Sequence, residues 1–236
     1  MAFAEIQRVS GETCRCGQFW QDRSVGLNMV VGVLVDVDDE YAEMVRTDFA
    51  VIGELLDRAG AGRWAEPAAI ESEEFEMWGY WGLHTVRRLA AHLAANGRLP
   101  EPLEDAHRAS DDALLNKAYA TPPSDPPGPF DHLIYHSDCE GYYVPVAFEH
   151  VIVDEKAAGG YLGSSVRLLE ETRRIAQALS LPEDLDPDSE EVFEAAGGDE
   201  AATEGWQRYG VEAYVCLKLL RAAELSVATG SAIAFC

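Results

Sequence analysis

The sequence predicts an α+β fold that is predominantly helical and carries a small antiparallel sheet. Three observations support this fold class. Apolar residues recur at the helical period over 39–59, 80–96, 165–180 and 207–229. Residues 27–37 form a run rich in aliphatic and β-branched side chains, and residues 131–148 have the pattern of two strands joined by a polar bend.

The first half of the chain begins with the expected buried strand at 27–37. Asp38 or Asp39 can cap the helix that follows, and Gly60 can end it, because glycine adopts the left-handed conformation at low cost. Residues 61–78 are irregular and acidic in this interpretation. The next helix runs over 80–96 and stops at Gly97, and a short helix is expected at 110–119.

The second half begins with the predicted hairpin, whose strands are 131–135 and 142–148, and a third strand is expected at 148–153. Ser164 or Ser165 can cap the helix at 165–180. A capping box from Asp188 to Glu191 predicts a short helix. The helix at 207–229 is apolar on most sides, which is typical of a helix in the centre of a core.

One segment could divide the chain. Residues 121–130 hold five prolines, which cannot continue a helix or a central strand. The segment is either a stiff linker or a loop that wraps a single domain. A length of 236 residues fits one large domain, and we expect a single domain over 1–236.

The net charge of the chain limits the class of partner that it can bind. The 42 acidic residues against 18 Lys and Arg give a net charge of −24. Such a surface repels phosphates and anionic lipid, so the expected partner is a basic protein, with no nucleic acid and no membrane. The odd number of cysteines, five, argues against a disulfide framework, and residues 1–8 lack a signal-peptide pattern. A cytoplasmic location with reduced thiols is therefore expected.

The bend of the predicted hairpin is the densest group of reactive side chains. His136, Asp138, Cys139 and Glu140 are the candidate catalytic residues, because a cysteine nucleophile needs a nearby histidine as its base. The same bend offers a binding surface, whose candidate residues are Ser137, Asp138, Glu140, Tyr142 and Tyr143. A purely structural turn stays open as well, since Ser137 and Asp138 favour bends and Gly141 tolerates positive φ.

No metal site or cofactor is expected. His132 and His136 on one strand would lie about 13 Å apart, too far to share an ion. Cys14 and Cys16 lack a second cysteine pair at zinc spacing. Residues 184–195 depart from the calcium-loop pattern, and the glycine-rich segment 159–165 lacks the lysine of a phosphate-binding loop.

The segment His136 to Pro145, HSDCEGYYVP, followed by the Gly-Ser-Ser helix start, resembles an uncharacterised group of bacterial proteins. The resemblance covers about residues 131–236. It implies a family and no activity.

Two main classes of function follow from the sequence, and a third interpretation is an oligomeric structural protein. The first is an acidic protein-binding protein, similar in role to an immunity protein or inhibitor, which the charge of −24 favours. The second is a small hydrolase or metal-dependent enzyme that uses the bend at 136–140. The sequence does not decide between them, and it leaves the oligomeric state open.

Overall fold

The computed structural model describes residues 27–235 except 36, 69–70, 78 and 198–204. Its helices are α2 (Asp39–Ala59), α3 (Gly79–Asn96), α4 (Ala113–Tyr119), α5 (Asp131–Ile134), α6 (Ser165–Leu179), α7 (Glu190–Gly197) and α8 (Gly210–Thr229), with short 3-10 turns at Ala106–Asp111, Ala158–Gly160 and Trp206–Tyr209. Among these helices, none has the length and apolar character needed to cross a membrane.

A mixed six-stranded sheet organises the molecule. In spatial order its strands are β2 (Glu73–Glu76), β1 (Asn28–Val31), β6 (Ile233–Phe235), β3 (Gly141–Val144), β5 (Tyr161–Ser164) and β4 (Ile152–Val153). Only β3 and β5 pair in parallel; the other neighbours are antiparallel. Strand β6 lies between β1 and β3, so it joins the two halves of the sheet.

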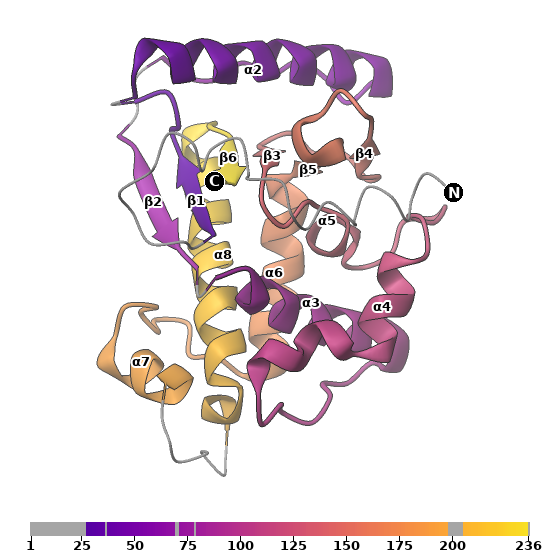
Figure 1. Cartoon of the computed structure of the whole chain (residues 1–236), viewed down its shortest axis with the longest axis vertical. Helices are drawn as coiled ribbons and strands as arrows, with labels where there is room; N and C mark the ends of the chain where they lie inside the picture. The colour runs from indigo at the N-terminus through magenta and orange to yellow at the C-terminus, as the bar shows by residue number, and fades with distance from the viewer. Residues whose placement is uncertain (1–26, 36, 69–70, 78, 198–204, 236) are drawn as a thin grey trace.

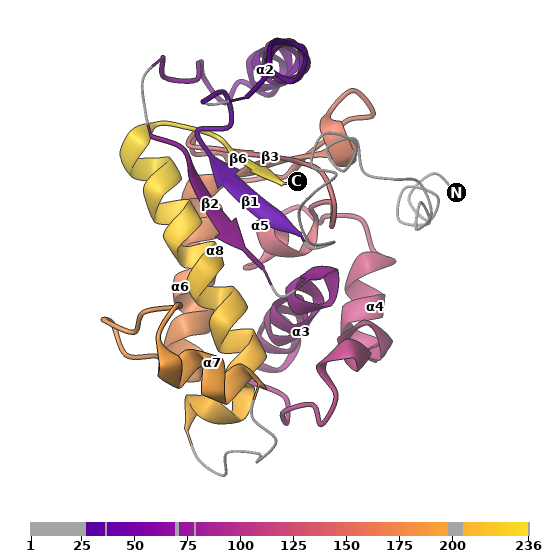
Figure 2. The same cartoon turned by 60° about the vertical axis from the view of Figure 1, so that its left-hand side comes forward.

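Each face of the sheet is covered by helices. Figure 2 shows α2 end-on at one face, with α8 and α6 on the other. Val30, Tyr142 and Leu162 point toward α2 and pack with Val45 and Leu56 of that helix. The neighbouring strand positions point the opposite way, as the two-residue period of a strand requires. They form the larger core with α3, α6 and α8, which includes Met29, Val31, Tyr143, Ile233 and Phe235.

Helix α2 begins and ends where the sequence predicts. The side chain of Asp38 accepts a hydrogen bond from the backbone N–H of Tyr41 at 2.8 Å, which caps the N-terminus. Gly60 closes the C-terminus with φ of 65°. The segment after α2 then crosses the sheet, because Trp64 donates its indole N–H to the carbonyl of Gly230 and Glu66 accepts the backbone N–H of Ala232.

The predicted hairpin at 131–148 is wrong. Residues 131–134 form helix α5, and β3 pairs with β5 and β6 instead of with a preceding strand. The period of the pattern could not distinguish the two structures, because residues 131–136 are buried on every side. A distant carboxylate fixes the helix: Glu171 of α6 accepts the backbone N–H groups of His132 and Leu133 at 3.1 and 2.7 Å.

The fold class is otherwise confirmed at a coarse level, as a predominantly helical α+β protein with a larger, mixed sheet. The predicted strand at 27–37 shortens to β1, because Gly32 adopts φ of 80° and turns the chain toward α2. The proline-rich segment 121–130 lies on the surface of the larger core. That core contains Leu89 and Leu115 from before the segment and Leu133 and Leu168 from after it.

Candidate functional site

Segment 136–140 is held to the helical layer by Arg87 of α3. This side chain is 1% exposed, and it donates hydrogen bonds to the carbonyls of Leu133 and His136, each at 2.8 Å. It also forms an ion pair with Asp138. A buried guanidinium needs its donors satisfied, and here most of them are satisfied by this one segment. Arg87 therefore fixes the backbone that carries the candidate catalytic residues.

His136 points into the core. Its ring stacks on Tyr143 with centroids 4.1 Å apart, and its two ring nitrogens face the carbonyls of Ser137 and Tyr142 at 3.0 and 3.3 Å. Burial, together with the nearby Arg87 charge, lowers the pKa of His136 to about 4. The imidazole is therefore neutral near pH 7, and its single N–H can donate to one of these two carbonyls.

The polar residues beyond His136 lie closer to the surface. The hydroxyl of Ser137 accepts the backbone N–H groups of Cys139 and Glu140 at 3.3 and 3.4 Å, and it lies 3.8 Å from the thiol of Cys139. The turn expected from Ser137 is thus present. Cys139 is half-buried. A catalytic role for His136, Asp138, Cys139 and Glu140 stays a prediction.

Asp138 belongs to a second network that sequence reasoning missed. Its carboxylate lies 3.4 Å from Nε2 of His84, and Nδ1 of His84 lies 2.8 Å from the hydroxyl of Tyr119. Burial lowers the pKa of His84 and raises the pKa of Tyr119 to about 12. Both shifts favour the neutral forms, so the network is a set of hydrogen bonds around the Arg87–Asp138 ion pair. The available sequence signal was the placement of His84, Arg88 and His92 at every fourth residue of the helix predicted over 80–96.

The two candidate binding tyrosines connect layers of the fold. Tyr142 donates its hydroxyl to Asp48 of α2 at 2.9 Å, and Tyr143 donates to the carbonyl of His132 at 2.8 Å. Glu140 and Tyr142 line a cavity of about 20 Å³ next to α2, which has room for about one water molecule. The binding role of Ser137, Asp138, Glu140, Tyr142 and Tyr143 also stays a prediction.

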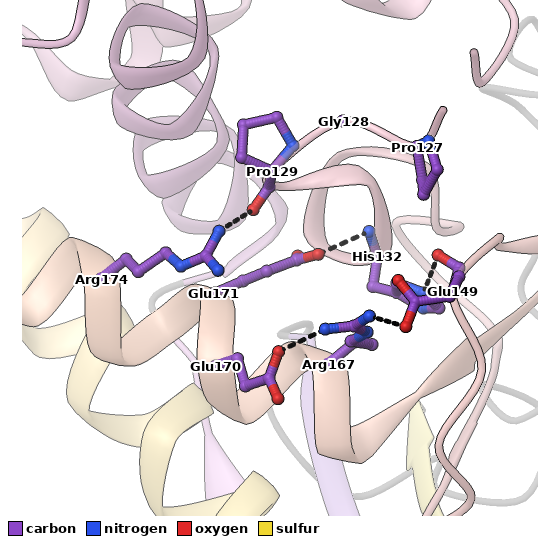
Figure 3. Close-up of a pocket in the computed structure, with 9 residues that line it drawn as sticks. All are labelled: Pro127, Gly128, Pro129, His132, Glu149, Arg167, Glu170, Glu171 and Arg174. Carbon is purple, nitrogen blue, oxygen red and sulfur yellow. Dashed lines mark hydrogen bonds and ion pairs between the residues drawn. The ribbon is translucent and has the colours of Figure 1, made fainter. Parts of the chain in front are cut away.

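A larger polar cavity of about 170 Å³ lies between α6 and the loop that precedes α5. Figure 3 shows Arg167 between Glu149 and Glu170, with Arg174 reaching the carbonyl of Pro129. Glu171 forms the inner wall, and burial raises its pKa to about 8 against the opposing effect of its two backbone hydrogen bonds. Each charged group around this cavity has a partner from the chain itself.

One exposed and strongly acidic feature is a face that we call the β2–α7 face. It combines the edge strand β2 with α7 and the turn before it, and its members are Glu73, Glu74, Glu76, Asp188, Glu190, Phe193 and Glu194. All seven residues are exposed. Figure 1 shows β2 and α7 on the same side of the molecule, along α8. Residues 61–78 were predicted to be irregular, so strand β2 was not expected.

Side chains from α8 connect the two parts of this face. Tyr214 donates its hydroxyl to the carbonyl of Glu76 at 2.9 Å, and its ring lies 5.7 Å from that of Phe193, measured between centroids. Lys218 lies 2.6 Å from the carboxylate of Asp188 and 5.5 Å from the centroid of Tyr214. Lys218 is itself buried. The acidic groups of β2 and α7 are therefore held on one framework.

The number of charges per unit length of β2 is similar to that of a DNA strand. Residues of a β-strand rise about 3.3 Å each, and phosphates of one DNA strand follow each other every 3.4 Å or so along the helix axis. Glu74 and Glu76 point to one face of β2 and Glu73 to the other, so three carboxylates lie over about 10 Å of extended chain. Over the same length, one DNA strand carries a similar number of charges.

Some predicted features cannot be placed. Cys14, Cys16 and Cys236 lie outside the residues that the structure describes, as do Asp36 and the acidic residues of 198–204. Within the described part of the chain, no group of three or more His, Cys, Asp or Glu side chains could hold a metal ion. His132 and His136 also face different backbone groups.

Fold and site together define an acidic protein that presents carboxylates on an exposed face. Over residues 25–235 the chain matches the model of a family described as "Putative DNA-mimic protein", and it belongs to that family. Searches of curated proteins and of solved structures gave no match. The match agrees with the expected family membership and covers more of the chain than 131–236, while the HSDCEGYYVP segment as its hallmark stays a prediction.

The family corrects the expectation about partners. The sequence predicts no nucleic-acid partner, because a charge of −24 repels phosphates. That argument addresses direct binding to DNA or RNA. A protein that mimics DNA is also negatively charged, but its charge imitates that of the nucleic acid. The family thus relates the chain to proteins that bind nucleic acid.

Proposed function

We propose that this protein binds a DNA-binding protein on the surface that the partner uses for DNA, and that it inhibits DNA binding in this way. The observation that carries the proposal is the exposed acidic strand β2, where Glu73, Glu74 and Glu76 place three carboxylates over about 10 Å of extended chain. Family membership supports the same conclusion. The role is that of an inhibitor or immunity protein with a basic target.

Electrostatic attraction increases the rate of association and favours a cationic partner. A net charge of −24 attracts a cationic surface over long distances and accelerates association at low ionic strength. It also repels DNA, RNA and other acidic proteins. Binding should weaken as salt rises, because the charges that drive it are exposed and screened over about 8 Å at physiological ionic strength.

The direct test is competition with DNA. The protein is immobilised and exposed at low salt to an extract of the cells that produce it. The retained proteins are then washed with excess duplex DNA. A retained DNA-binding protein is then purified, and its complex with a fluorescent duplex is titrated with this protein. We expect loss of fluorescence anisotropy, with weaker competition at about 200 mM salt than at about 50 mM. Retention that excess DNA does not reduce would contradict the proposal.

A matched pair of variants locates the effect. Glu73, Glu74 and Glu76 are replaced by Gln in one protein, and Glu40, Glu43 and Glu54 on the exposed side of α2 are replaced by Gln in the other. Both variants lose the same charge. We expect the first to require at least tenfold more protein to displace the duplex, and the second to stay within about threefold of wild type.

A further inference from the structure

The outer face of α7 carries an aromatic side chain that the fold leaves exposed. Phe193 is 45% exposed, and the other large hydrophobic residues exposed in the described part of the chain, Val153 and Val227, are aliphatic. A surface that acts only through its negative charge does not require an exposed phenylalanine. Aromatic side chains at protein surfaces are enriched at the centres of interfaces.

The structure holds Phe193 in a fixed position. Its ring packs on Tyr214, which is 5% exposed and fixed by its hydrogen bond to the carbonyl of Glu76. The start of α7 is fixed as well, because Ser189 accepts the backbone N–H of Val192 and Lys218 holds Asp188. A side chain with little freedom loses little entropy when a partner covers it.

Acidic groups surround this ring and determine what can cover it. Glu190 lies one helical turn before Phe193 and Glu194 follows it, while the glutamates of β2 lie beyond Tyr214. A second copy of this chain would bring two such acidic rims together, and like charges at an interface are unfavourable. A cationic partner gains from the same rim.

We propose that Phe193 is the apolar anchor of the face that binds the target, and that the target presents an apolar side chain within its basic surface. This inference rests on the proposed function and deepens it. The acidic rim aligns the cationic partner, and the buried contact at Phe193 distinguishes a protein partner from a surface that is merely positive. The interface thus has an apolar centre and a charged border.

The test uses two fluorescent lysine peptides of equal charge, one with a central pair of leucines and one with a central pair of serines. Wild-type protein should bind the leucine peptide about five- to tenfold more tightly. Phe193→Ala should abolish this preference, and Phe193→Leu should retain most of it. Val227→Ala on α8 makes a comparable truncation at an exposed residue and should leave the preference unchanged.

Each outcome decides the inference. Equal affinity of wild type for the two peptides, no binding of either, or a preference that survives Phe193→Ala would overturn it. Self-association of wild type that Phe193→Ala removes, measured by sedimentation, would assign the face to a second copy instead. Displacement of DNA in the competition assay is a separate readout, so the proposed function can stand when the anchor fails. Unfolding curves confirm that the Phe193 variants are folded.

Discussion

Arg87 shows how much a single side chain can determine locally. It lies inside the helical layer at 1% exposure and binds the carbonyls of Leu133 and His136 as well as the carboxylate of Asp138. Without Arg87, the carbonyls of Leu133 and His136 lose their buried hydrogen-bond donor and Asp138 loses its buried cationic partner. Arg87 thus holds segment 133–138 together with Glu171, which accepts the backbone N–H of Leu133.

Arg87→Met should therefore destabilise the protein by about 3–5 kcal/mol. The measurement is urea unfolding followed by circular dichroism. Arg173→Met is the control, because Arg173 is exposed and its ion pair with Glu224 lies at the surface. This control should change the free energy of unfolding by less than about 1 kcal/mol. Equal effects of the two substitutions would show that Arg87 does not organise the segment.

The two buried histidines predict a loss of stability in acid. Burial lowers the pKa values of His132 and His136 from 6.5 to about 4. The unfolded chain binds protons at these residues first, so their contribution to stability is complete above about pH 6.5 and is lost as the pH falls toward 4. Each shift corresponds to a loss of about 3 kcal/mol over this range.

We expect the free energy of unfolding to fall between pH 6.5 and 4, and the fall to be smaller in His136→Phe. Phenylalanine preserves the stacking on Tyr143 but cannot be protonated. His150→Gln is the control, because His150 is exposed. Urea unfolding at several pH values gives the comparison. A slope in His136→Phe that equals the wild-type slope would exclude His136 as a source of acid sensitivity.

At the scale of elements, the parallel pair β3 and β5 depends on close packing. Gly163 lies in β5 opposite Tyr143, and a Cβ added there would overlap the Tyr143 ring. That ring also stacks on His136 and its hydroxyl binds the carbonyl of His132. Tyr143 therefore cannot move aside without breaking contacts to α5 and to segment 136–140.

Gly163→Ala should destabilise the protein by about 1–3 kcal/mol, because the added methyl group meets a side chain with no room to relax. Gly53→Ala is a matched control in α2, where a Cβ would have no neighbour within 4 Å. There alanine should stabilise the protein by about 0.5–1 kcal/mol, since it favours the helix. Thermal unfolding measures whether each substitution lowers or raises the stability of the protein. A change in the same direction for both variants would contradict this explanation.

Whole-molecule organisation was only partly predictable from the sequence. Long amphipathic helices such as α2 and α6 have strong periods and clear caps, and the prediction places them within a few residues. The apolar helix α8 is also placed within a few residues. The sheet was harder, because most of its strands have only two to four residues. Pairings such as Met29 with Phe235 join distant parts of the sequence, and no local pattern indicates them.

The candidate site illustrates the same limit. The reactive side chains of 136–140 are visible in the sequence, but the burial of His136 depends on Arg87 and Tyr143, which arrive from α3 and β3. The β2–α7 face is likewise created by Tyr214, which links a strand and a helix more than 100 residues apart in the chain. Composition alone predicted an acidic, protein-binding character, and it could not locate the face.

The position of β6 has a consequence for how the molecule is made. Residues 233–235 hydrogen-bond to β1 on one side and to β3 on the other, and they are the last strand of the sheet to leave the ribosome. Until they do, the pair β2–β1 and the trio β3–β5–β4 each expose an edge that would otherwise be internal. A nascent chain at this stage is vulnerable to aggregation. The strongly negative charge opposes contact between such chains, because like charges repel each other.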